Sequence, residues 1–389
     1  MLSMRILHTN MHRGGWGGQP NRILKICMHL RERGHSVTLA VPRGSTLSRR
    51  AHSEGLDVFD DLRFPRGFHP WIYFSEVQKL RRLIEEKGIR IVHTHGSQDT
   101  WAGVVAARLA HPSALVVRTR HNTNPVGTDV VHRWLYTRLI HRVIANSDAV
   151  REEFRRNKLV EPHRVETIFS AVDTRLFNSS ISGDGVRAAL NIPSDVPLVG
   201  IVGRLDPKKG HQYFLEAAQK VCRHIPSTMF LVVGEGPLDK ELRAYTRELR
   251  IEGKVIFTDL REDVPPILAA LDVFAISSLK ESFPTSILEA MAMERPVVAT
   301  RVGSIESSVL DGITGYVVPP SDPGAMAEKI ISLLHDRKTA RTMGKAGRQL
   351  VMERFNEEIM AQKTEKVYIR LLEEANGEGK QNYREMFHR

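Results

Sequence analysis

The sequence predicts an α/β protein made of two successive doubly wound domains, each with helices on both faces of a parallel sheet. Short runs of aliphatic and β-branched residues alternate with amphipathic stretches, as is typical of parallel sheets covered by helices. The alternation stops at residues 178–196, a stretch rich in Ser, Gly, Asp and Pro, and then restarts. The 389 residues also exceed the length at which one hydrophobic core keeps growing. Ligands are expected at the carboxyl ends of the strands and in the cleft between the domains.

The first domain is expected to span residues 1–178. Nearly continuous apolar runs predict its strands, and apolar residues that recur every three or four positions predict its helices. The strands are expected at 4–10, 36–42, 89–96, 114–120 and 142–148, and the helices at 20–34 and 71–88.

The second domain is expected to span residues 179–355. An amphipathic pattern at 356–375 predicts a further long helix, and the tail at 376–389 lacks a clear period and is expected to fray. The strands of the second domain are expected at 197–203, 227–233, 254–259, 272–278, 295–300 and 315–319, and its helices at 210–224, 237–250, 285–294 and 323–335.

The composition is that of a globular protein, with 41% apolar and 26% charged residues. No run approaches the ~18 apolar residues of a membrane-spanning helix, and the N-terminus leads straight into a strand-like run without a signal-peptide layout. Cys27 and Cys222 are the two cysteines and lie far apart in the sequence. Neither a disulfide framework nor a cysteine zinc site is predicted, and a cytoplasmic location is expected.

The net positive charge of the chain lies entirely in its first half. Residues 1–180 carry 28 Lys and Arg against 16 Asp and Glu, whereas residues 181–389 carry 28 against 29. This asymmetry indicates an anionic partner for the first half, although a generally basic proteome is an alternative explanation. No nucleic-acid partner is predicted, because no basic region with interleaved aromatics and no zinc-finger spacing occurs. A peripheral contact with an anionic membrane, or an acidic glycan, is the favoured interpretation.

Residues 280–291, KESFPTSILEAM, form a predicted corner between a strand and a helix. Pro284 suits the first helical position, where its missing N–H group costs nothing. The backbone N–H groups at such a helix start stabilise a diphosphate, together with the helix dipole. Glu281 on the strand side is then placed to reach the sugar attached to the diphosphate, and Glu289 to reach ribose hydroxyls. On spacing alone, two surface acids beside an ordinary helix cap are the stronger interpretation.

A basic turn follows the first strand of the second domain, in the sequence GRLDPKKG. Arg204 offers a planar fork of donors, and Lys208 and Lys209 offer mobile point charges. Such cations stabilise the charge that develops when a nucleoside diphosphate departs. Basic turns are common, so this motif is weak evidence by itself.

A glycine-rich loop, RGGWGGQP at residues 13–20, follows the first strand of the first domain. Gly14, Gly15, Gly17 and Gly18 allow the backbone to approach a ligand closely or to take positive φ. The loop lacks the GxGxxG dinucleotide fingerprint. A flexible surface loop is the alternative.

Three histidines lie at predicted strand ends: His93 and His95 after one strand, and His121 after another. No carboxylate or third histidine lies nearby at ligand spacing, so no metal site is predicted. The three are interpreted as polar groups of the cleft, with His121 the strongest candidate to touch a transferred sugar.

Taken together, these motifs resemble the family 4 retaining glycosyltransferases of the GT-B fold, of the group 1 type found in bacterial lipopolysaccharide and polysaccharide synthesis. The resemblance extends from the GGWGG loop through GRLDPKKG, VVGEGPLDKEL and ESFPTSILEAMAMERPVVAT to DGITGYVVPPSDP. It implies two Rossmann-like domains facing a cleft, with the 356–375 helix packed back on the first domain. The pair of acids separated by seven residues, in order with the basic turn, is its most specific part.

The resemblance also implies roles for individual residues. Arg204 and Lys209 would hold the donor diphosphate, Glu281 the donor sugar and Glu289 the ribose. Four catalytic residues and twelve donor-binding residues are thus expected: Arg204, Lys209, Glu281 and His121 as catalytic residues, and Gly17, Gly18, Gly203, Gly234, Gly236, Arg261, Ser282, Phe283, Pro284, Thr285, Ser286 and Glu289 as donor-binding residues.

Two positions depart from the family pattern. Ala171 stands where the family usually has glycine, and Asp259 lies where glycine is frequent in the base-pocket loop. Neither belongs to the predicted phosphate grip, so these departures bear on the identity of the base more than on activity.

The expected reaction is transfer of a sugar from a nucleotide sugar, with a UDP-sugar favoured, to a lipid-linked or cell-surface glycan at the cytoplasmic face of the inner membrane. No carboxylate stands out as a covalent nucleophile, so front-face displacement with retention is expected, with no metal and no cofactor besides the nucleotide-sugar co-substrate. A nucleotide-sugar epimerase on the same scaffold and a donor-binding protein without turnover are the alternatives.

Overall fold

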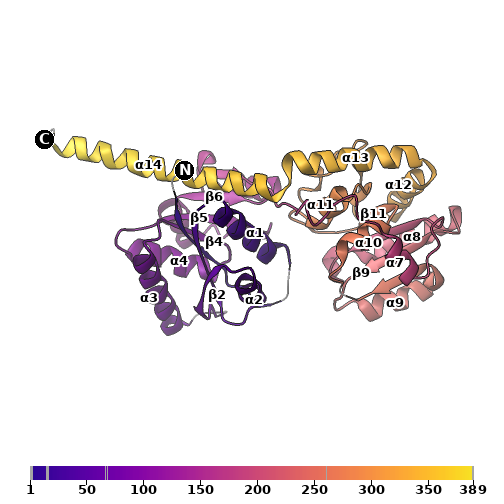
Figure 1. Cartoon of the computed structure of the whole chain (residues 1–389), viewed down its shortest axis with the longest axis horizontal. Coiled ribbons are helices and arrows are strands. Elements are labelled where there is room, and N and C mark those ends of the chain that lie inside the picture. The colour runs from indigo at the N-terminus through magenta and orange to yellow at the C-terminus, as the bar shows by residue number, and fades with distance from the viewer. Residues whose placement is uncertain (1–2, 15–16, 66, 68, 260, 388–389) are drawn as a thin grey trace. The chain divides into compact units, whose positions relative to one another are not determined.

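The structure is a computed structural model that describes residues 3–14, 17–65, 67, 69–259 and 261–387, of which 378–387 are described by their backbone alone. Gly15 of the glycine-rich loop lies outside the described residues. The chain forms two compact units (Figure 1). The N-terminal unit contains Met1–Ser170 and Glu357–Arg389, and the C-terminal unit contains Ala171–Asn356. The first division therefore falls before the polar 178–196 stretch, all of which belongs to the C-terminal unit.

The N-terminal unit is built on a seven-stranded parallel sheet with the strand order β3-β2-β1-β4-β5-β6-β7. Its central strands are buried along almost their whole length, which explains their uninterrupted apolar sequences. The strands are β1 (Arg5–Thr9), β2 (Ser36–Pro42), β3 (Asp57–Leu62), β4 (Ile91–Thr94), β5 (Leu115–Arg120), β6 (Arg142–Ala145) and β7 (Val165–Thr167).

Helices connect these strands and cover the sheet. In the first of them, Ile23, Ile26, Cys27 and Leu30 form one apolar stripe and are fully buried. Each fully buried aliphatic side chain of this kind stabilises the fold by roughly 1.5–3 kcal/mol. The helices are α1 (Gly18–Glu32), α2 (Thr46–Ser53), α3 (Pro70–Lys87), α4 (Gln98–Leu109), α5 (Val130–Trp134), continued by a π-helical turn at Leu135–Leu139, α6 (Asp148–Asn157) and a 3₁₀ turn at Pro162–Arg164.

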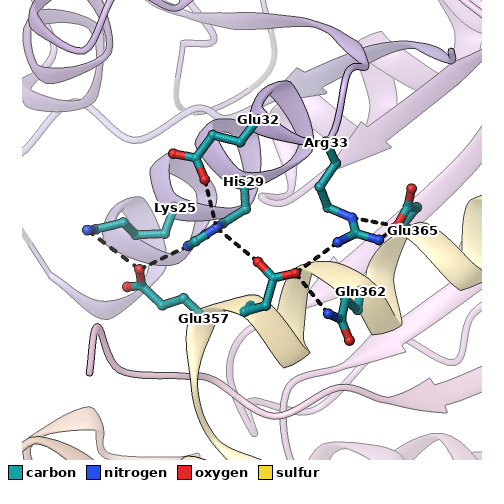
Figure 2. Close-up of polar contacts among 8 residues, drawn as sticks. Lys25, His29, Glu32, Arg33, Glu357, Gln362 and Glu365 are labelled. Carbon is teal, nitrogen blue, oxygen red and sulfur yellow. Dashed lines mark hydrogen bonds and ion pairs between the residues drawn. The ribbon is translucent and has the colours of Figure 1, made fainter. Parts of the chain in front are cut away.

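The last helix of the chain, α14 (Glu357–Phe387), belongs to the N-terminal unit and packs against α1. Figure 2 shows basic side chains of α1 meeting acids of α14. The carboxylate of Glu357 lies 3.5 Å from Lys25 Nζ and 3.4 Å from His29 Nε2. Arg33 Nε donates a 2.7 Å hydrogen bond to Glu365. Opposite charges therefore fix the end of the chain to the start of the unit.

The C-terminal unit repeats the plan with a six-stranded parallel sheet in the order β10-β9-β8-β11-β12-β13. One face of this sheet forms a hydrophobic core with the helices at 211–224 and 323–335. The strands are β8 (Leu198–Val202), β9 (Met229–Val233), β10 (Val255–Thr258), β11 (Val273–Ile276), β12 (Val297–Thr300) and β13 (Gly315–Val318).

The helices of this unit cover both faces of its sheet (Figure 1). In α8, the fully buried Phe214, Leu215, Ala218 and Val221 again share one face. The helices are α7 (Asp184–Ala189), α8 (His211–His224), α9 (Asp239–Glu248), α10 (Val264–Ala270), α11 (Thr285–Ala292), α12 (Pro323–His335) and α13 (Arg337–Arg354), with 3₁₀ turns at Pro207–Lys209, Glu252–Lys254 and Ile305–Ser307.

Each sheet has one place where the strand order reverses, between β1 and β4 in the first unit and between β8 and β11 in the second. At such a point the connections leave in opposite directions and open a crevice at the carboxyl ends of the two strands. His8 of β1 pairs in register with His93 of β4 at the first reversal. The basic turn and Glu281 follow β8 and β11 at the second.

The predicted α/β class is confirmed, although several elements differ from the prediction. The edge strand β3 was not predicted, because its sequence, DVFDDL, contains three acids and no continuous apolar run. Pro284 is the residue before α11 and not its first residue. Helix α14 continues to Phe387, through the tail expected to fray; that tail contains several good helix formers. Among the described helices, none has both the length and the apolar character that crossing a bilayer requires.

Candidate functional site

A basic turn at the end of β8 forms the first part of the site in the C-terminal unit. The side chain of Asp206 accepts a 2.8 Å hydrogen bond from the Lys208 backbone N–H and so begins the short 3₁₀ turn that ends at Lys209. Gly210 then takes a left-handed conformation with φ of 60°. A Cβ at Gly210 would lie 2.3 Å from the carbonyl oxygen of Ser277, so only glycine lets this turn pack against the end of β11.

This packing places Lys209 against Glu281. Lys209 Nζ lies 2.5 Å from Glu281 Oε1, and Ser278 Oγ donates a 2.8 Å hydrogen bond to the same oxygen. Ser277 Oγ also donates to the backbone carbonyl of Lys209 at 3.2 Å. Residues more than seventy positions apart thus form one ion pair across the β8–β11 reversal.

Glu289 lies one turn inside α11 and is partly buried. Burial raises the pKa of Glu289 to about 7, although a hydrogen bond from the Thr285 side chain and the charge of Lys209 both oppose the rise. The carboxyl group is therefore close to half ionised at neutral pH. Because Lys209 acts on Glu289 and pairs with Glu281, the structure brings all three predicted residues together.

The ESFPTS turn links the two acids. Pro284 is extended at the start of α11, and Phe283 is buried with its ring centroid 5.6 Å from that of Phe355. The Ser304 N–H donates to the Ser282 carbonyl at 3.2 Å, and a Cβ at Gly303 would lie 2.1 Å from the Glu281 carbonyl oxygen. The turn is thus held from behind.

The first residues of α11 lie in front of this rigid turn. Thr285 and Ser286 open the helix, where backbone N–H groups have no partner inside the helix. Both side chains are partly exposed. The arrangement offers unpaired donors beside Lys209 and the two acids, which suits an anion linked to a polyhydroxyl group.

Arg204 follows β8, but its side chain does not join the Lys209–Glu281 pair. It is exposed, and within the described part of the chain it forms neither a hydrogen bond nor an ion pair. Its backbone is fixed by flanking hydrogen bonds: Gly203 N–H donates to the Val233 carbonyl at 3.0 Å and Leu205 N–H to the Glu235 carbonyl at 2.9 Å. Its predicted contact with a diphosphate stays a prediction.

Two glycines predicted to bind the donor, Gly234 and Gly236, pack against this same segment. Gly234 has φ of 140°, and a Cβ there would lie 2.1 Å from the Gly203 carbonyl oxygen. A Cβ at Gly236 would lie 2.3 Å from the Leu205 carbonyl oxygen. These glycines therefore let two strand ends approach each other. Arg261 is engaged in a two-pronged ion pair with Asp263, at 2.6–2.7 Å.

In the N-terminal unit, Gly17 is the residue before α1 and Gly18 is its first residue. A Cβ at either position would meet no described atom within 4 Å. Packing within the described part of the unit therefore does not require glycine there, whereas a ligand that approaches the start of α1 would.

The predicted histidines form a continuous hydrogen-bonded chain at the β1–β4 reversal. His121 Nε2 lies 3.0 Å from His95 Nδ1, and His95 Nε2 lies 3.0 Å from His8 Nδ1. The Tyr368 hydroxyl of α14 lies 3.3 Å from His8 Nε2 and 2.5 Å from His93 Nδ1. The chain ends at Thr119, whose hydroxyl lies 2.7 Å from His93 Nε2.

The histidines of this chain are neutral at physiological pH. Burial lowers the pKa of His8 to about 3 and holds the pKa values of His93, His95 and His121 well below the usual range. A neutral imidazole has one donor and one acceptor nitrogen, so the tautomer of each ring fixes that of the next. The outer nitrogen of His121 is therefore a donor or an acceptor according to the direction of the whole chain.

Three members of this chain were missed by sequence reasoning: His8, Tyr368 and Thr119. His8 brings a third histidine beside His93 and His95, with ring nitrogens within 4.8 Å of one another, so the prediction that no third histidine lies near is wrong. The reason is that β1 and β4 are adjacent in the sheet although 87 residues separate His8 from His95. A histidine near the end of each of two predicted parallel strands is the signal that was available. Tyr368 carried no comparable signal.

Two family models match the chain, one on each unit. The model described as Glycosyltransferase Family 4 matches residues 16–176, and that described as Glycosyl transferases group 1 matches residues 184–350. One similar curated protein is the UDP-Gal:α-D-GlcNAc-diphosphoundecaprenol α-1,3-galactosyltransferase of Escherichia coli, 28% identical over 75% of this chain and 78% of that protein. Another is the N-acetyl-α-D-glucosaminyl L-malate synthase of Bacillus anthracis, 26% identical over 88% of this chain and 96% of that protein.

Solved structures share the fold over nearly the whole length. HepE of Anabaena in complex with UDP has a TM-score of 0.81, with 22% identity over 94% of this chain and 99% of that one. At this identity the similarity concerns the fold.

Proposed function

The chain belongs to family 4 of the glycosyltransferases and has the GT-B fold, and we propose that it transfers a sugar from a UDP-sugar to a lipid-linked or cell-surface glycan acceptor with retention of configuration. It is a glycosyltransferase, and the similar fold of HepE was solved with UDP bound. The UDP-sugar donor, the retention of configuration and the glycan acceptor are the proposed parts of this function.

The ion pair between Lys209 and Glu281 beside the start of α11 is the observation that supports the proposal most strongly. A diphosphate at the helix start accepts hydrogen bonds from the first-turn N–H groups and attracts Lys209. Glu281, freed in part from Lys209, accepts hydrogen bonds from sugar hydroxyls. Glu289 accepts from the ribose hydroxyls in its ionised form. Cation, helix start and two acids thus match the parts of a nucleotide sugar.

The proposed reaction is a front-face displacement. The acceptor hydroxyl oxygen forms a bond to the anomeric carbon while the bond from that carbon to the diphosphate oxygen breaks. The hydroxyl proton passes to the departing diphosphate oxygen. Lys209, with Arg204, stabilises the negative charge that develops on the leaving group, so no metal ion is needed in the proposed mechanism.

A lipid-linked acceptor is supported by two observations. The galactosyltransferase of Escherichia coli is named for a diphosphoundecaprenol acceptor, and residues 1–180 of this chain hold the whole excess of positive charge. Anionic headgroups attract clustered Lys and Arg by about 1 kcal/mol per charge near the surface. We therefore place the enzyme at the cytoplasmic face of the membrane, as a peripheral protein.

A two-step experiment tests the proposal. A panel of nucleotide sugars is first scored by thermal shift, since a ligand that binds only the folded state raises its stability. The stabilising donor is then incubated with and without a lipid diphosphate acceptor, and product stereochemistry is read by NMR. We expect nucleotide release that depends on acceptor and an α-linked product from an α-linked donor. An inverted product overturns the mechanism, and sugar isomerisation with donor alone indicates an epimerase.

A further inference from the structure

A cavity of about 260 Å³ lies in the N-terminal unit next to the His121 end of the histidine chain, and none of its lining residues belongs to that chain or to the donor site. It is formed by the end of β5, the loop that follows β5, and α5. The charged side chains that line it are those of two arginines and one histidine, and no acidic side chain is among its lining residues. Its lining residues include Arg118, Arg120, Asn122, His132 and Tyr136.

The two arginines share one face of β5, because side chains two positions apart in a strand point the same way. Arg118 is 5% exposed, and its guanidinium lies over the ring of Tyr136 at 5.2 Å. Arg120 donates hydrogen bonds to the Asn124 carbonyl at 2.7 Å and to the Pro125 carbonyl at 3.5 Å, and burial lowers the pKa of Arg120. Both positive charges therefore lie on the same face of β5, at the cavity.

These cations lack counter-ions. Within the described part of the chain, the Nε atoms of Arg118 and Arg120 and the hydroxyl of Tyr136 are buried without a hydrogen-bond partner. The nearest acids act at longer range: Asp99 on Arg118 and Glu153 on Arg120, neither in an ion pair among the described residues. The lining histidine, His132, already has an acidic partner, because its Nδ1 lies 2.6 Å from Asp129 Oδ2.

Guanidinium groups that are buried without a counter-ion destabilise a fold by several kcal/mol, unless an anion completes the site. The planar fork of arginine matches phosphate geometry, and two such forks match the double charge of a phosphoryl group. We propose that the cavity lined by Arg118, Arg120 and Tyr136 binds a phosphoryl group of the acceptor. Assignment of this phosphoryl group to the acceptor rests on the proposed function, whereas its binding in the cavity does not.

Exposed apolar side chains beside the cavity indicate a lipid-linked source for this phosphoryl group. Trp71 is 86% exposed at the start of α3, and Val130 and Trp134 of α5 are 83% and 51% exposed. The two helices are joined to the cavity through Trp101, which lines it: Trp101 accepts a hydrogen bond from Tyr73 of α3 at 3.1 Å and lies edge-on to His132 of α5 at 6.1 Å. Large exposed apolar groups of this kind mark interaction surfaces.

The first arm of the test measures binding of inorganic phosphate to the full chain by calorimetry. All proteins carry Lys209→Ala, which weakens the diphosphate site of the C-terminal unit. We expect Arg118→Gln and Asn122→Asp to weaken phosphate binding at least tenfold. Asn122 is exposed, and aspartate keeps the oxygen that accepts from the Asn124 N–H while adding a repelling charge. The control Arg151→Gln removes an exposed charge on α6 and is expected to change nothing.

The outcomes of this arm are distinct. Three results would each overturn the phosphoryl assignment. They are no phosphate binding, equal weakening by Arg151→Gln, and equally tight binding of L-malate, an anion without a phosphoryl group. If Arg118→Gln does not fold, Asn122→Asp decides alone. Because no nucleotide sugar is present, failure of the proposed transferase reaction leaves this result standing, and loss of phosphate binding leaves the transferase proposal standing.

The second arm separates a lipid phosphate from a soluble one. Flotation with phosphatidylcholine vesicles is measured with and without phosphatidic acid. We expect retention that requires phosphatidic acid and that is lost in Asn122→Asp and in Trp71→Ser. Phosphate binding without any retention on these vesicles would overturn the lipid-linked source and assign the cavity to a soluble phosphorylated acceptor.

Discussion

The two units place different chemistry at the same topological position. At the β8–β11 reversal, Lys209 and Glu281 form a charged pair beside a helix start. At the β1–β4 reversal, buried imidazoles form a neutral hydrogen-bonded chain closed by Tyr368. Both reversals open a crevice at strand ends, so topology sets where polar groups gather and the residues set what they do. The charged reversal suits a diphosphate, whereas the neutral one suits directed hydrogen bonding.

The histidine chain and Glu289 also respond to pH in opposite directions. The folded pKa values of the histidines lie below the unfolded value of 6.5, so the stability that they contribute is present above pH 6.5 and is lost as the pH falls. The folded pKa of Glu289 lies above its unfolded value of 4.5, so its contribution is lost as the pH rises through about 7. Acid is therefore expected to weaken the N-terminal unit first.

The largest effect is expected at the charged reversal. Lys209→Ala removes the cation that opposes charge on the leaving diphosphate, and turnover should fall by about 10²–10³-fold, as for loss of a single preorganised donor elsewhere. The neighbouring Lys208→Ala serves as the control, since Lys208 is exposed and pairs with no described carboxylate. Steady-state nucleotide release measures both. Near-normal turnover in Lys209→Ala would remove Lys209 from the mechanism.

Acid should next separate the two units. At about pH 5 the unfolded chain has protonated His8 while the folded chain has not, which costs about 2 kcal/mol of unfolding free energy from His8 alone. Hydrogen exchange at pH 7 and pH 5 reports each unit separately. We expect lower protection factors in β1, β4 and β5 at pH 5, once the slower intrinsic exchange at that pH is taken into account. His211 has a pKa lowered to about 4 and gives the C-terminal unit a smaller loss. Equal losses in both units would contradict the comparison.

Breaking the neutral chain at Tyr368 should cost less. Tyr368→Phe leaves two buried imidazole nitrogens without their shared hydroxyl, which destabilises the fold by about 1–3 kcal/mol. Tyr73→Phe is the matched control, because its hydroxyl bond to Trp101 is exposed. Chemical denaturation measures both. A change in the pH profile of turnover in Tyr368→Phe would further show that the chain sets the state of His121, which a packing role alone would not produce.

The smallest effect is expected at Glu289. A charged carboxylate accepts stronger hydrogen bonds than a neutral one, by about 1 kcal/mol, so ribose binding should tighten by about fivefold as the pH rises through the Glu289 pKa of about 7. Uridine is the suitable probe because it has no phosphate to titrate. Glu289→Gln should bind uridine with the same affinity from pH 6 to pH 8. A pH dependence that survives in this variant would assign it to another group.

The sequence predicted the sheets better than their edges. Strands such as 36–42 and 114–120 are buried on both faces, so their apolar runs are long and unambiguous. The edge strand β3 is half covered and carries three acids. Helix α4 was not predicted because its many small residues give little periodicity. Long-range pairing, and hence strand order, is not encoded in any local pattern.

The site shows the same limit. Glu281, Glu289 and the basic turn were found because each follows a recognisable strand, and the structure brings Lys209 and both acids together. The exposed side chain of Arg204 and the packing role of Gly234 depend on neighbours distant in sequence. The same holds for His8 and Tyr368, which meet across 360 residues.

One measurement tests most directly whether the charged reversal, and not the neutral one, holds the donor diphosphate. UDP binding is measured by calorimetry for the unaltered protein, Lys209→Ala and Tyr368→Phe, at a temperature where all three are folded. Loss of a charge-assisted contact worth about 1.5–3 kcal/mol predicts at least tenfold weaker binding for Lys209→Ala, with Tyr368→Phe unchanged. Unchanged affinity in Lys209→Ala, or an equal loss in Tyr368→Phe, would contradict the assignment.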